Sequence, residues 1–341
     1  MTLISIIETG KVPVLLAPMA GVTDLPFRNA VSKFGVDMVF SEMIADHSLL
    51  SRVVKNQKIE LGTSFYNTAV QLAGCEPATM GEAAKIVSDH GARAIDINMG
   101  CPAKKVVGGY SGSALMRDLK KASAIIESVV NAVDVPVSLK ARLGWDDGSK
   151  NAKDLGLLAE QCGVRLITIH ARTRNQFYKG FADWNAILEV KQAVKIPVIA
   201  NGDIVDIRSA SQALKVSETD GLMMGRGVIG KPWIISQISA CVNNEPQPSS
   251  PNGLSLIEII AEHYDEILSF YGESLGVRIA RKHLKRYLDI FGLSKKLSTE
   301  FLRENSAKEV VKKLFEIPKR VNPSIWIMRK FGCLFRFHLS F

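Results

Sequence analysis

Short apolar runs alternate with longer amphipathic segments over the first two thirds of the chain. Four of the longer segments place their apolar residues at helical spacing, namely 78–90, 113–133, 151–162 and 183–194. The apolar runs have the length of strands and occupy residues 12–19, 38–43, 69–74, 94–99, 137–143, 166–172, 197–203 and 221–227. Strands that alternate with helices pair in parallel through helical crossovers. Eight such units in about 250 residues predict an α/β fold, a (β/α)8 TIM barrel.

A doubly wound parallel sheet is the alternative arrangement of such units. It would require a glycine-rich dinucleotide-binding turn, G-x-G-x-x-G, directly after the first strand. The first run instead ends in Ala17-Pro18-Met19-Ala20-Gly21, which does not contain this motif. The pattern therefore favours the closed barrel.

The pattern changes after residue 243, and this change divides the chain. Residues 1–243 form the predicted catalytic barrel, and 244–253, rich in Pro, Ser and Asn, form a predicted linker. In 254–317 apolar residues recur at helical spacing only, which predicts a small all-α bundle domain. The last segment, 318–341, places aromatic residues among Arg and Lys and fits neither pattern, so we expect an irregular tail.

The composition is that of a globular protein, with 47% hydrophobic and 23% charged residues. The cysteines stand at positions 75, 101, 162, 241 and 333, without a C-x-x-C pair. This spacing argues against a disulfide framework, a zinc site or an iron–sulfur cluster, and for a reducing compartment. The amino terminus does not resemble an export signal, and no apolar stretch reaches the ~18 residues of a membrane span. We therefore expect a cytoplasmic protein without a metal and without membrane association.

Positive charge is concentrated in the last quarter of the chain. The net charge is +9, and residues 251–341 hold 16 Lys and Arg against 10 Asp and Glu. A basic appendage on a nearly neutral body indicates a polyanionic partner, whereas a solvated surface with excess lysine is the alternative.

Much of this charge falls on one predicted helix. Its basic residues recur at spacings of three and four, and they are Arg278, Arg281, Lys282, Lys285 and Arg286. Residues with this spacing share one helix face, and the opposite face is apolar. Such a basic stripe suits the phosphate backbone of a nucleic acid, and a merely soluble helix face is the alternative.

Two predicted strands carry basic side chains in the phase that faces the barrel interior. Lys140 lies in 137–143 and His170 in 166–172, each toward the carboxyl end of its run. The outward phase must be apolar, because it packs on the helices. A buried lysine without a partner is costly and normally marks an anionic ligand. An internal ion pair with a strand carboxylate is the alternative.

Glycine-rich turns follow the seventh and eighth runs, at 201–203 and 224–230. The corresponding loops of TIM barrels often bind phosphate, because glycine lets backbone N–H groups approach the oxygens. With Lys140, His170 and the ends of the first and third strands, these turns surround one ligand. A phosphorylated cofactor with an anionic reduced form fits this arrangement. We therefore predict flavin mononucleotide (FMN), with Lys140 stabilising the negative charge that appears on reduction.

One cysteine follows a predicted buried strand directly. The fourth run ends at Met99, and the chain continues as Gly100-Cys101-Pro102. In a barrel this places the thiol of Cys101 at the carboxyl end of the strand, where barrel enzymes keep their chemistry. A thiol held there by Gly and Pro can give or take a proton. A small buried hydrophobic residue is the alternative, and position alone does not decide between them.

These motifs resemble those of the tRNA-dihydrouridine synthases, most closely the bacterial B-type enzymes. The resemblance runs from about residue 10 to 316, and its most specific part is the Asn-x-Gly-Cys-Pro element that contains Cys101. It is carried by residues 17–24, 97–102, 170–174, 200–203, 225–227 and 278–283. It implies a TIM barrel followed by a helical domain that binds tRNA, and we expect a monomer.

The resemblance implies an FMN enzyme that uses NADPH to reduce the C5–C6 double bond of selected uridines in the tRNA D-loop to 5,6-dihydrouridine. Reduced flavin would deliver hydride to C6, and Cys101 would donate the proton to C5. Asn98 would help to hold the uracil, and tRNA would bind Arg278, Arg281 and Lys282. The cofactor contacts would fall on Pro18, Met19, Ala20, Gln71, Lys140, His170, Asn201, Gly202, Asp203, Gly225 and Arg226.

Two other functions are compatible with the residues themselves. A flavin-dependent reductase of a free pyrimidine or another small enone would share the barrel, the cofactor and Cys101, but it would not need the basic helical domain. A non-enzymatic RNA-binding or regulatory protein would bind no flavin, so it would be colourless when purified.

Overall fold

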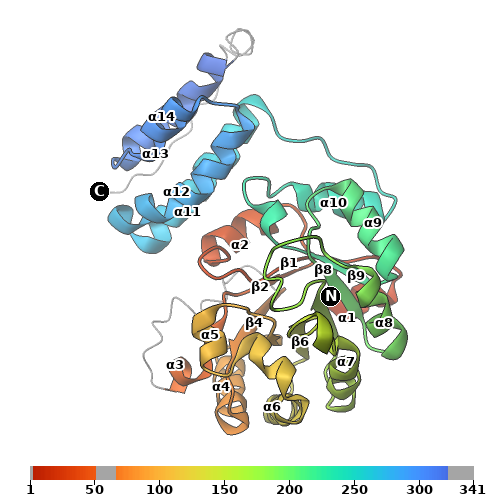
Figure 1. Cartoon of the computed structure of the whole chain (residues 1–341). Helices are drawn as coiled ribbons and strands as arrows, with labels where there is room; N and C mark the ends of the chain where they lie inside the picture. The colour runs from red at the N-terminus through yellow and green to blue at the C-terminus, as the bar shows by residue number, and fades with distance from the viewer. Residues whose placement is uncertain (1–2, 51–66, 322–341) are drawn as a thin grey trace. The chain divides into compact units, whose positions relative to one another are not determined.

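The computed structural model describes residues 3–50 and 67–321, with side chains as far as residue 317. The chain separates into two compact units, Met1–Ser249 and Ser250–Phe341, and each is described by itself (Figure 1). Among the described residues, no helix is long and apolar enough to cross a membrane.

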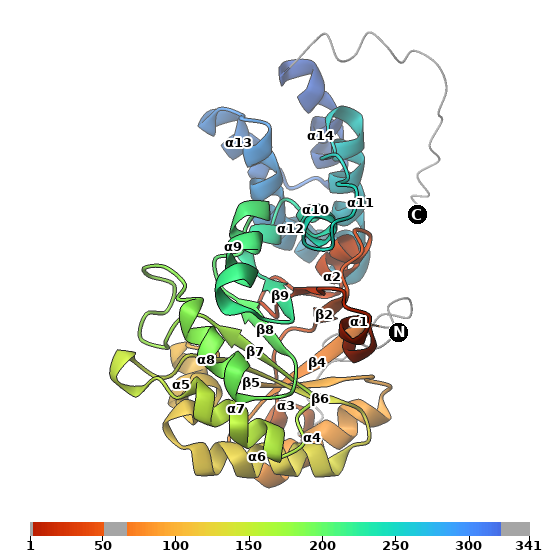
Figure 2. The ribbon, with the colours of Figure 1, turned by 90° about the vertical axis from the view of Figure 1, so that its right-hand side faces the viewer.

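The first unit is a closed barrel of parallel strands (Figures 1 and 2). Its eight strands, all within the described residues, are β1 (Val14–Leu16), β2 (Met38–Phe40), β4 (Thr68–Ala73), β5 (Ile95–Met99), β6 (Val137–Arg142), β7 (Leu166–His170), β8 (Val198–Asn201) and β9 (Gly221–Met224). Each pairs in parallel with the next, β2 pairs with β4, and β9 pairs with β1 to close the barrel. The predicted TIM barrel is therefore confirmed, with one strand in each predicted apolar run.

The second predicted strand is shorter than expected. β2 ends at Phe40, and the chain continues to a two-residue strand, β3 (Ile44–Ala45), which pairs with the carboxyl-terminal part of β4. The bend between the two strands is stabilised by the Ser41 hydroxyl, which accepts a hydrogen bond from the Gln71 N–H (3.0 Å). This bend brings Met43 to the carboxyl end of the barrel.

Helices follow the strands as the pattern predicts. In the described part of the first unit they are α1 (Leu3–Glu8), α2 (Leu25–Ser32), α3 (Asp46–Leu50), α4 (Pro77–Asp89), α5 (Lys104–Gly108), α6 (Leu119–Ala132), α7 (Ala152–Gln161), α8 (Asn185–Ala193), α9 (Ile207–Ser217) and α10 (Ile234–Val242), with short 3₁₀ helices η2 (Gly112–Arg117), η3 (Asp147–Ser149) and η4 (Arg226–Val228). The single helix expected over 113–133 is divided between η2 and α6. Asp118 causes the division, because its carboxylate caps α6 by accepting from the Lys121 N–H (3.0 Å).

The barrel interior is apolar at one end and polar at the other. A cluster of buried apolar side chains, which includes Leu15, Phe40 and Ile199, packs with Leu3 of α1. Toward the carboxyl ends of the strands, buried polar side chains replace them. Since burying polar groups costs free energy unless they are paired, this layer indicates the functional end of the barrel.

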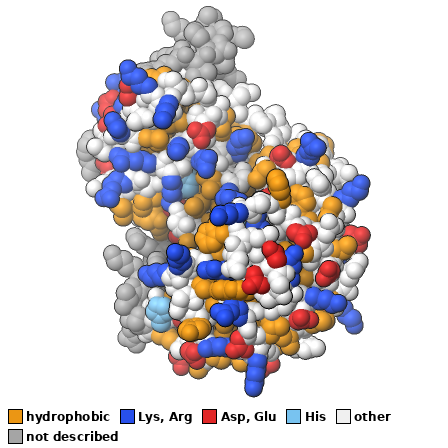
Figure 3. All heavy atoms as spheres, in the orientation of Figure 1, with side chains coloured by type: hydrophobic (Ala, Val, Ile, Leu, Met, Phe, Trp, Pro, Cys, Tyr) orange, Lys and Arg blue, Asp and Glu red, His pale blue; other side chains and the backbone are white. Residues whose placement is uncertain are grey.

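The second unit consists of α11 (Gly253–Tyr271), α12 (Glu273–Ile290), α13 (Lys295–Leu302) and α14 (Ala307–Val321) in its described part. Its core includes Ile260, Tyr264, Leu284 and Leu314. α14 continues to Val321, so the chain is helical beyond the expected end at residue 317. The rest of the predicted irregular tail, 322–341, lies outside the described residues. On the face shown in Figure 3, Lys and Arg side chains gather over this unit.

Candidate active site

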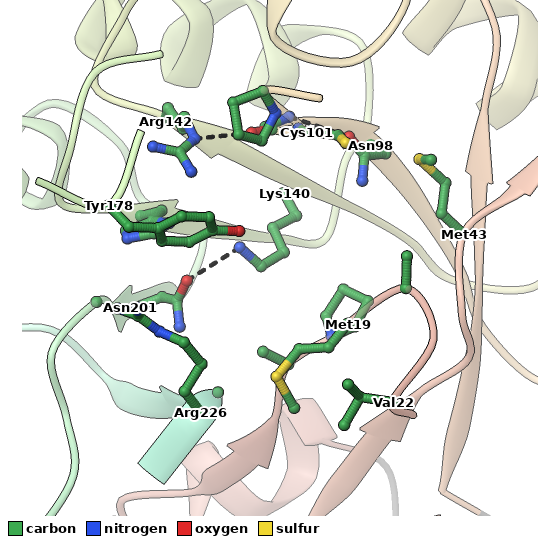
Figure 4. Close-up of a pocket in the computed structure, with 18 of the residues that line it drawn as sticks. Met19, Val22, Met43, Asn98, Cys101, Lys140, Arg142, Tyr178, Asn201 and Arg226 are labelled. Carbon is green, nitrogen blue, oxygen red and sulfur yellow. Dashed lines mark hydrogen bonds between the residues drawn. The ribbon is translucent and has the colours of Figure 1, made fainter. Parts of the chain in front are cut away.

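A cavity of about 410 Å³ opens at the carboxyl ends of the barrel strands (Figure 4). This volume lies in the range of small-molecule and cofactor sites. Every residue predicted to contact the cofactor lines it, as do Asn98 and Cys101: Pro18, Met19, Ala20, Gln71, Lys140, His170, Asn201, Gly202, Asp203, Gly225 and Arg226. Residues from the ends of seven strands therefore meet in one cavity.

Lys140 is buried at the floor of this cavity. Its Nζ donates a hydrogen bond to Oδ1 of Asn201 (3.0 Å), whose amide in turn donates to the Met223 carbonyl (2.7 Å). The partner of this lysine is thus a neutral amide, in contrast to the ion pair considered as the alternative. Burial and the nearby Arg142 lower the pKa of Lys140 to about 8, so it is mostly protonated at neutral pH.

His170 lies beside Lys140 and is held neutral. Burial lowers its pKa well below the usual value, and Lys140, Arg142, Arg172 and Arg226 add to this effect. Its Nε2 is buried and has no hydrogen-bond partner in the described structure. A Cβ at Gly202 would lie 2.8 Å from the His170 ring, and Gly202 also has a φ of +113°, so this position requires glycine. The imidazole thus leaves one polar atom for a ligand.

Asp203 stabilises the surrounding loops through hydrogen bonds, a role that the sequence did not predict. Its carboxylate accepts hydrogen bonds from both Nη atoms of Arg172 (2.9 and 2.5 Å) and from the Ala182 N–H (2.9 Å). Burial opposes its ionisation, but these hydrogen bonds outweigh burial and lower the pKa of Asp203. Arg226 lies further away, at 3.8 Å, and its side chain remains 58% exposed. Cationic side chains therefore outnumber ionised carboxylates around the cavity, which suits an anionic ligand.

The Cys101 turn is held from both sides. Oδ1 of Asn98 accepts hydrogen bonds from the N–H groups of Gly100 (3.2 Å) and Cys101 (2.9 Å), and Ser113 donates twice to the Cys101 carbonyl. Arg142 Nε donates to the Gly100 carbonyl (2.8 Å), as Figure 4 shows. Cys101 itself is half-buried and lines the cavity. Its side chain is therefore not a small apolar filler of the core.

A chain of buried polar groups fixes the orientation of Asn98. The carboxylate of Asp96, at the base of this chain, accepts hydrogen bonds from Ser138 Oγ (2.6 Å) and Gln71 Nε2 (2.7 Å). Gln71 Oε1 then accepts from Asn98 Nδ2 (2.8 Å). Because an ionised carboxylate only accepts, it turns the NH₂ group of Gln71 toward itself, and Asn98 must present its oxygen to the Cys101 turn. Asp96 is thus a positioning residue for the thiol.

We expect Asp96→Ala to lower the free energy of unfolding by about 1–3 kcal/mol, because it leaves the buried amide of Gln71 without an acceptor. Asp96→Asn retains a carbonyl that can accept from Gln71, so it should restore most of this loss. Urea denaturation of the two variants measures the difference. Equal destabilisation by both substitutions would show that the acceptor is unimportant.

Asp96→Asn also tests how the free energy of unfolding depends on pH, and the pKa of Asp96 gives this dependence a definite sign. Burial raises the pKa of Asp96 from 3.8 to about 6, so the native state holds this proton more tightly than the unfolded chain. The group therefore lowers the free energy of unfolding as pH rises from about 4 to 6. Asp96→Asn should lack that decrease relative to the unmodified protein, and an identical pH profile would contradict the assignment.

Sequence reasoning missed several of the lining residues, including Arg142 and Tyr178. Arg142 braces the cavity wall by donating to the carbonyls of Gly100, Thr173 and Phe177, and Tyr178 stacks between Arg142 and Arg226, whose guanidinium carbons lie 5.5 and 4.7 Å from its ring centroid. Arg142 had a signal, since it shares the inward phase of Lys140. Tyr178 lies in the β7–α8 loop, where no periodic pattern indicates which side chains face inward.

The predicted basic stripe lies on α12 of the second unit, with one difference. Arg278, Lys282, Lys285 and Arg286 are exposed there. Arg281 is half-buried, and its Nη2 donates to Oδ1 of Asn305 (2.7 Å) and to the Glu304 carbonyl (3.4 Å). Arg281 therefore ties α12 to the loop between α13 and α14. The helical spacing predicted the face correctly but could not show this contact.

A closed β/α barrel with a cationic cavity and a thiol at its carboxyl end defines a TIM-barrel enzyme. A sequence model of the family described as "Dihydrouridine synthase (Dus)" matches residues 15–322. The chain belongs to the dihydrouridine synthase family, whose members are flavin-dependent oxidoreductases.

Several curated proteins are similar over most of their length. The "Probable tRNA-dihydrouridine synthase" of Rhodobacter capsulatus is 55% identical over 280 residues, which are 81% of this chain and 86% of that protein. The protein of the same name from Rickettsia conorii is 52% identical over 80% of this chain and 83% of its own. "tRNA-dihydrouridine synthase B" of Xanthomonas campestris is 42% identical over 80% and 83%.

Among solved structures, histamine dehydrogenase from a Rhizobium species is similar with a TM-score of 0.50 and 14% sequence identity. The similarity covers 74% of this chain and 48% of that one. At this identity the comparison supports the barrel fold alone.

Proposed function

We propose that this protein reduces the C5–C6 double bond of uridines in the D-loop of tRNA to 5,6-dihydrouridine, with FMN as cofactor and NADPH as reductant. The observation that carries the proposal is the placement of the Cys101 thiol in the cavity that Lys140 and His170 line. Family membership and the names of the relatives support tRNA as the substrate.

The side chains around the cavity fit FMN. The buried Nε2 of His170 needs a polar partner, and Lys140 offers a cation beside it. The turns that contain Asn201–Asp203 and Gly225–Arg226 carry glycines and a cation suited to a phosphate. These residues, with Pro18–Ala20 and Gln71, would hold the cofactor.

The chemistry divides between the cofactor and the protein. Bound FMN, reduced by NADPH, would supply hydride to the electron-poor C6 of the uracil. The resulting enolate requires a proton at C5, and the Cys101 thiol would donate it. Since Cys101 is half-buried rather than enclosed, its thiolate can regain a proton from solvent.

Asn98 would serve both the thiol and the substrate. Its oxygen holds the Cys101 turn, and one N–H of its amide donates to Gln71. An amide nitrogen carries two hydrogens, so one N–H remains for a carbonyl oxygen of the uracil. The target base must leave its stack to reach this group, which costs a few kcal/mol. Phosphate contacts elsewhere would offset this cost, and we assign them to Arg278, Lys282, Lys285 and Arg286 on α12.

The test is a comparison of two substrates with the purified protein. We expect a flavin absorbance spectrum that bleaches when NADPH is added, and formation of dihydrouridine in an unmodified tRNA transcript but not in free uridine. Equal activity on free uridine would favour a reductase of small pyrimidines. A protein that binds no FMN from solution would reject the proposal.

A further inference from the structure

The large apolar side chains that the barrel unit exposes all lie at one end, as far as the structure describes that unit. They are Tyr110, Phe177, Tyr178, Phe181 and Val205, and each belongs to a loop at the carboxyl end of a strand. Phe181 is 91% exposed and Tyr110 is 73% exposed. Exposed apolar groups gathered on one face normally mark a binding surface. The four aromatic residues of this set are called the aromatic rim below.

The aromatic rim comes from two loops, and both follow Cys101 in the sequence. Tyr110 follows α5, directly after the Cys101 turn, and the other three lie in the β7–α8 loop. Because all barrel strands are parallel, both loops lie at the mouth of the cavity, and Figure 2 shows the loops after β6 and β7 on the same side as α5. Phe177 and Tyr178 line the cavity, whereas Tyr110 and Phe181 do not. The rim thus extends from the cavity onto the surrounding surface.

Cationic side chains are found at the same end of the barrel as the aromatic rim. Trp145, in the loop after β6, lies between two guanidinium groups, with Arg117 and Arg174 at 4.8 and 4.6 Å from its ring centroid. Lys104 and Lys105 on α5 and Lys179 in the β7–α8 loop are exposed. The acidic residues of this end are partly matched, since Lys150 lies 4.0 Å from Asp147 and 3.6 Å from Asp183. Separate aromatic rings among cations suit nucleotides better than they suit a continuous apolar protein surface.

We propose that the aromatic rim stacks on unpaired nucleotides of the RNA substrate, next to the nucleotide that enters the cavity. This inference rests on the proposed function and assigns to the barrel a second kind of RNA contact, distinct from the phosphate contacts assigned to α12. Single-stranded RNA is recognised largely through bases stacked on aromatic side chains. Stacked neighbours would hold the RNA open while one base occupies the cavity, so the rim would offset part of the free-energy cost of unstacking that base.

Stacking and phosphate binding differ in their response to salt. A phosphate contact releases counterions, so its loss reduces the slope of log Kd against log salt concentration. A stacked base releases none. Removal of a rim aromatic should therefore weaken binding by the same factor at every salt concentration, whereas removal of a cation on α12 should change the slope.

The experiment measures Kd for an unmodified tRNA transcript over a salt series, with Tyr110→Ala and Phe181→Ala. We expect each to weaken binding roughly 5- to 100-fold without a change in slope. Phe181→Tyr keeps an aromatic ring and should bind with the affinity of the unmodified protein. Phe181→Leu is apolar but not aromatic, so it should bind as weakly as Phe181→Ala. Leu254→Ala is the matched control, because Leu254 is 46% exposed on α11, outside the helix assigned to phosphate contacts, and carries no ring. Lys285→Gln is the comparison that should change the slope.

The outcomes separate this inference from the proposed function. Flavin absorbance and its bleaching by NADPH should be unchanged in Tyr110→Ala and Phe181→Ala, because neither residue lines the cavity. If the unmodified protein does not act on tRNA, the proposed function fails. If it acts on tRNA and both variants bind with its affinity and slope, the rim proposal is overturned while the function stands. Full binding by Phe181→Leu would also overturn it, in favour of a general apolar contact such as a protein partner would make.

Discussion

Replacement of Cys101 by alanine should slow the reduction of tRNA by about 10²- to 10⁴-fold, the range typical of a lost general acid. The turn that carries Cys101 is held through backbone groups, by Asn98 and Ser113, and these hydrogen bonds do not involve the thiol. The variant should therefore fold and retain the cavity. The measurement is product formation in a single turnover, with flavin content determined on the same sample.

Two further substitutions control this prediction. Cys241→Ala removes a half-buried thiol of α10, outside the cavity, and should leave the rate unchanged. Cys101→Ser keeps a proton donor, but a hydroxyl is a far weaker acid than a thiol, so this variant should also be slow. A Cys101→Ala variant that reduces tRNA at the rate of the unmodified protein would exclude the thiol as the proton donor.

The alternation of apolar and polar residues was sufficient to predict the barrel and the inward-facing Lys140 and His170. A parallel strand covered by helices must be apolar on one face, so a polar residue in the other phase has to point inward. The same rule applies to Asp96 and Arg142, each two residues from a predicted site residue. This rule gives the direction in which a side chain points but not its depth in the barrel. Depth distinguishes Asp96, which lies beneath the site, from Asn98, which lies in it.

Residues outside periodic elements could not be predicted in this way. Tyr178 and Phe181 belong to a loop that repeats no pattern, so only the folded chain shows that one lines the cavity and the other faces solvent. Arg281, in contrast, lies in a periodic helix, but its contact is made with a loop. Its helical spacing placed it correctly on the basic face of α12, but the partner that holds it, Asn305, lies in a loop that the spacing cannot position.

Replacement of Lys140 by methionine should weaken FMN binding roughly 30- to 1,000-fold, because it removes a buried cation from the site of an anionic ligand. Methionine has a similar length and suits a buried position, so the barrel should remain folded. Lys121→Met is the control, since Lys121 lies on α6 and pairs with Glu76 (2.8 Å) away from the cavity. The Kd for FMN follows from quenching of flavin fluorescence, and an unchanged Kd in Lys140→Met would contradict the role.

The pKa of Lys140 predicts two pH dependences of opposite sign, one for FMN binding and one for the free energy of unfolding. Because this pKa is about 8, FMN should bind progressively more weakly as pH rises above 8 and the ammonium group loses its proton. Without FMN the same shift acts in the other direction. The unfolded chain holds this proton up to its ordinary pKa of 10.5, so the free energy of unfolding should rise with pH between about 8 and 10.5. Lys140→Met should lose both dependences together. Loss of only one would mean that another group titrates in the cavity.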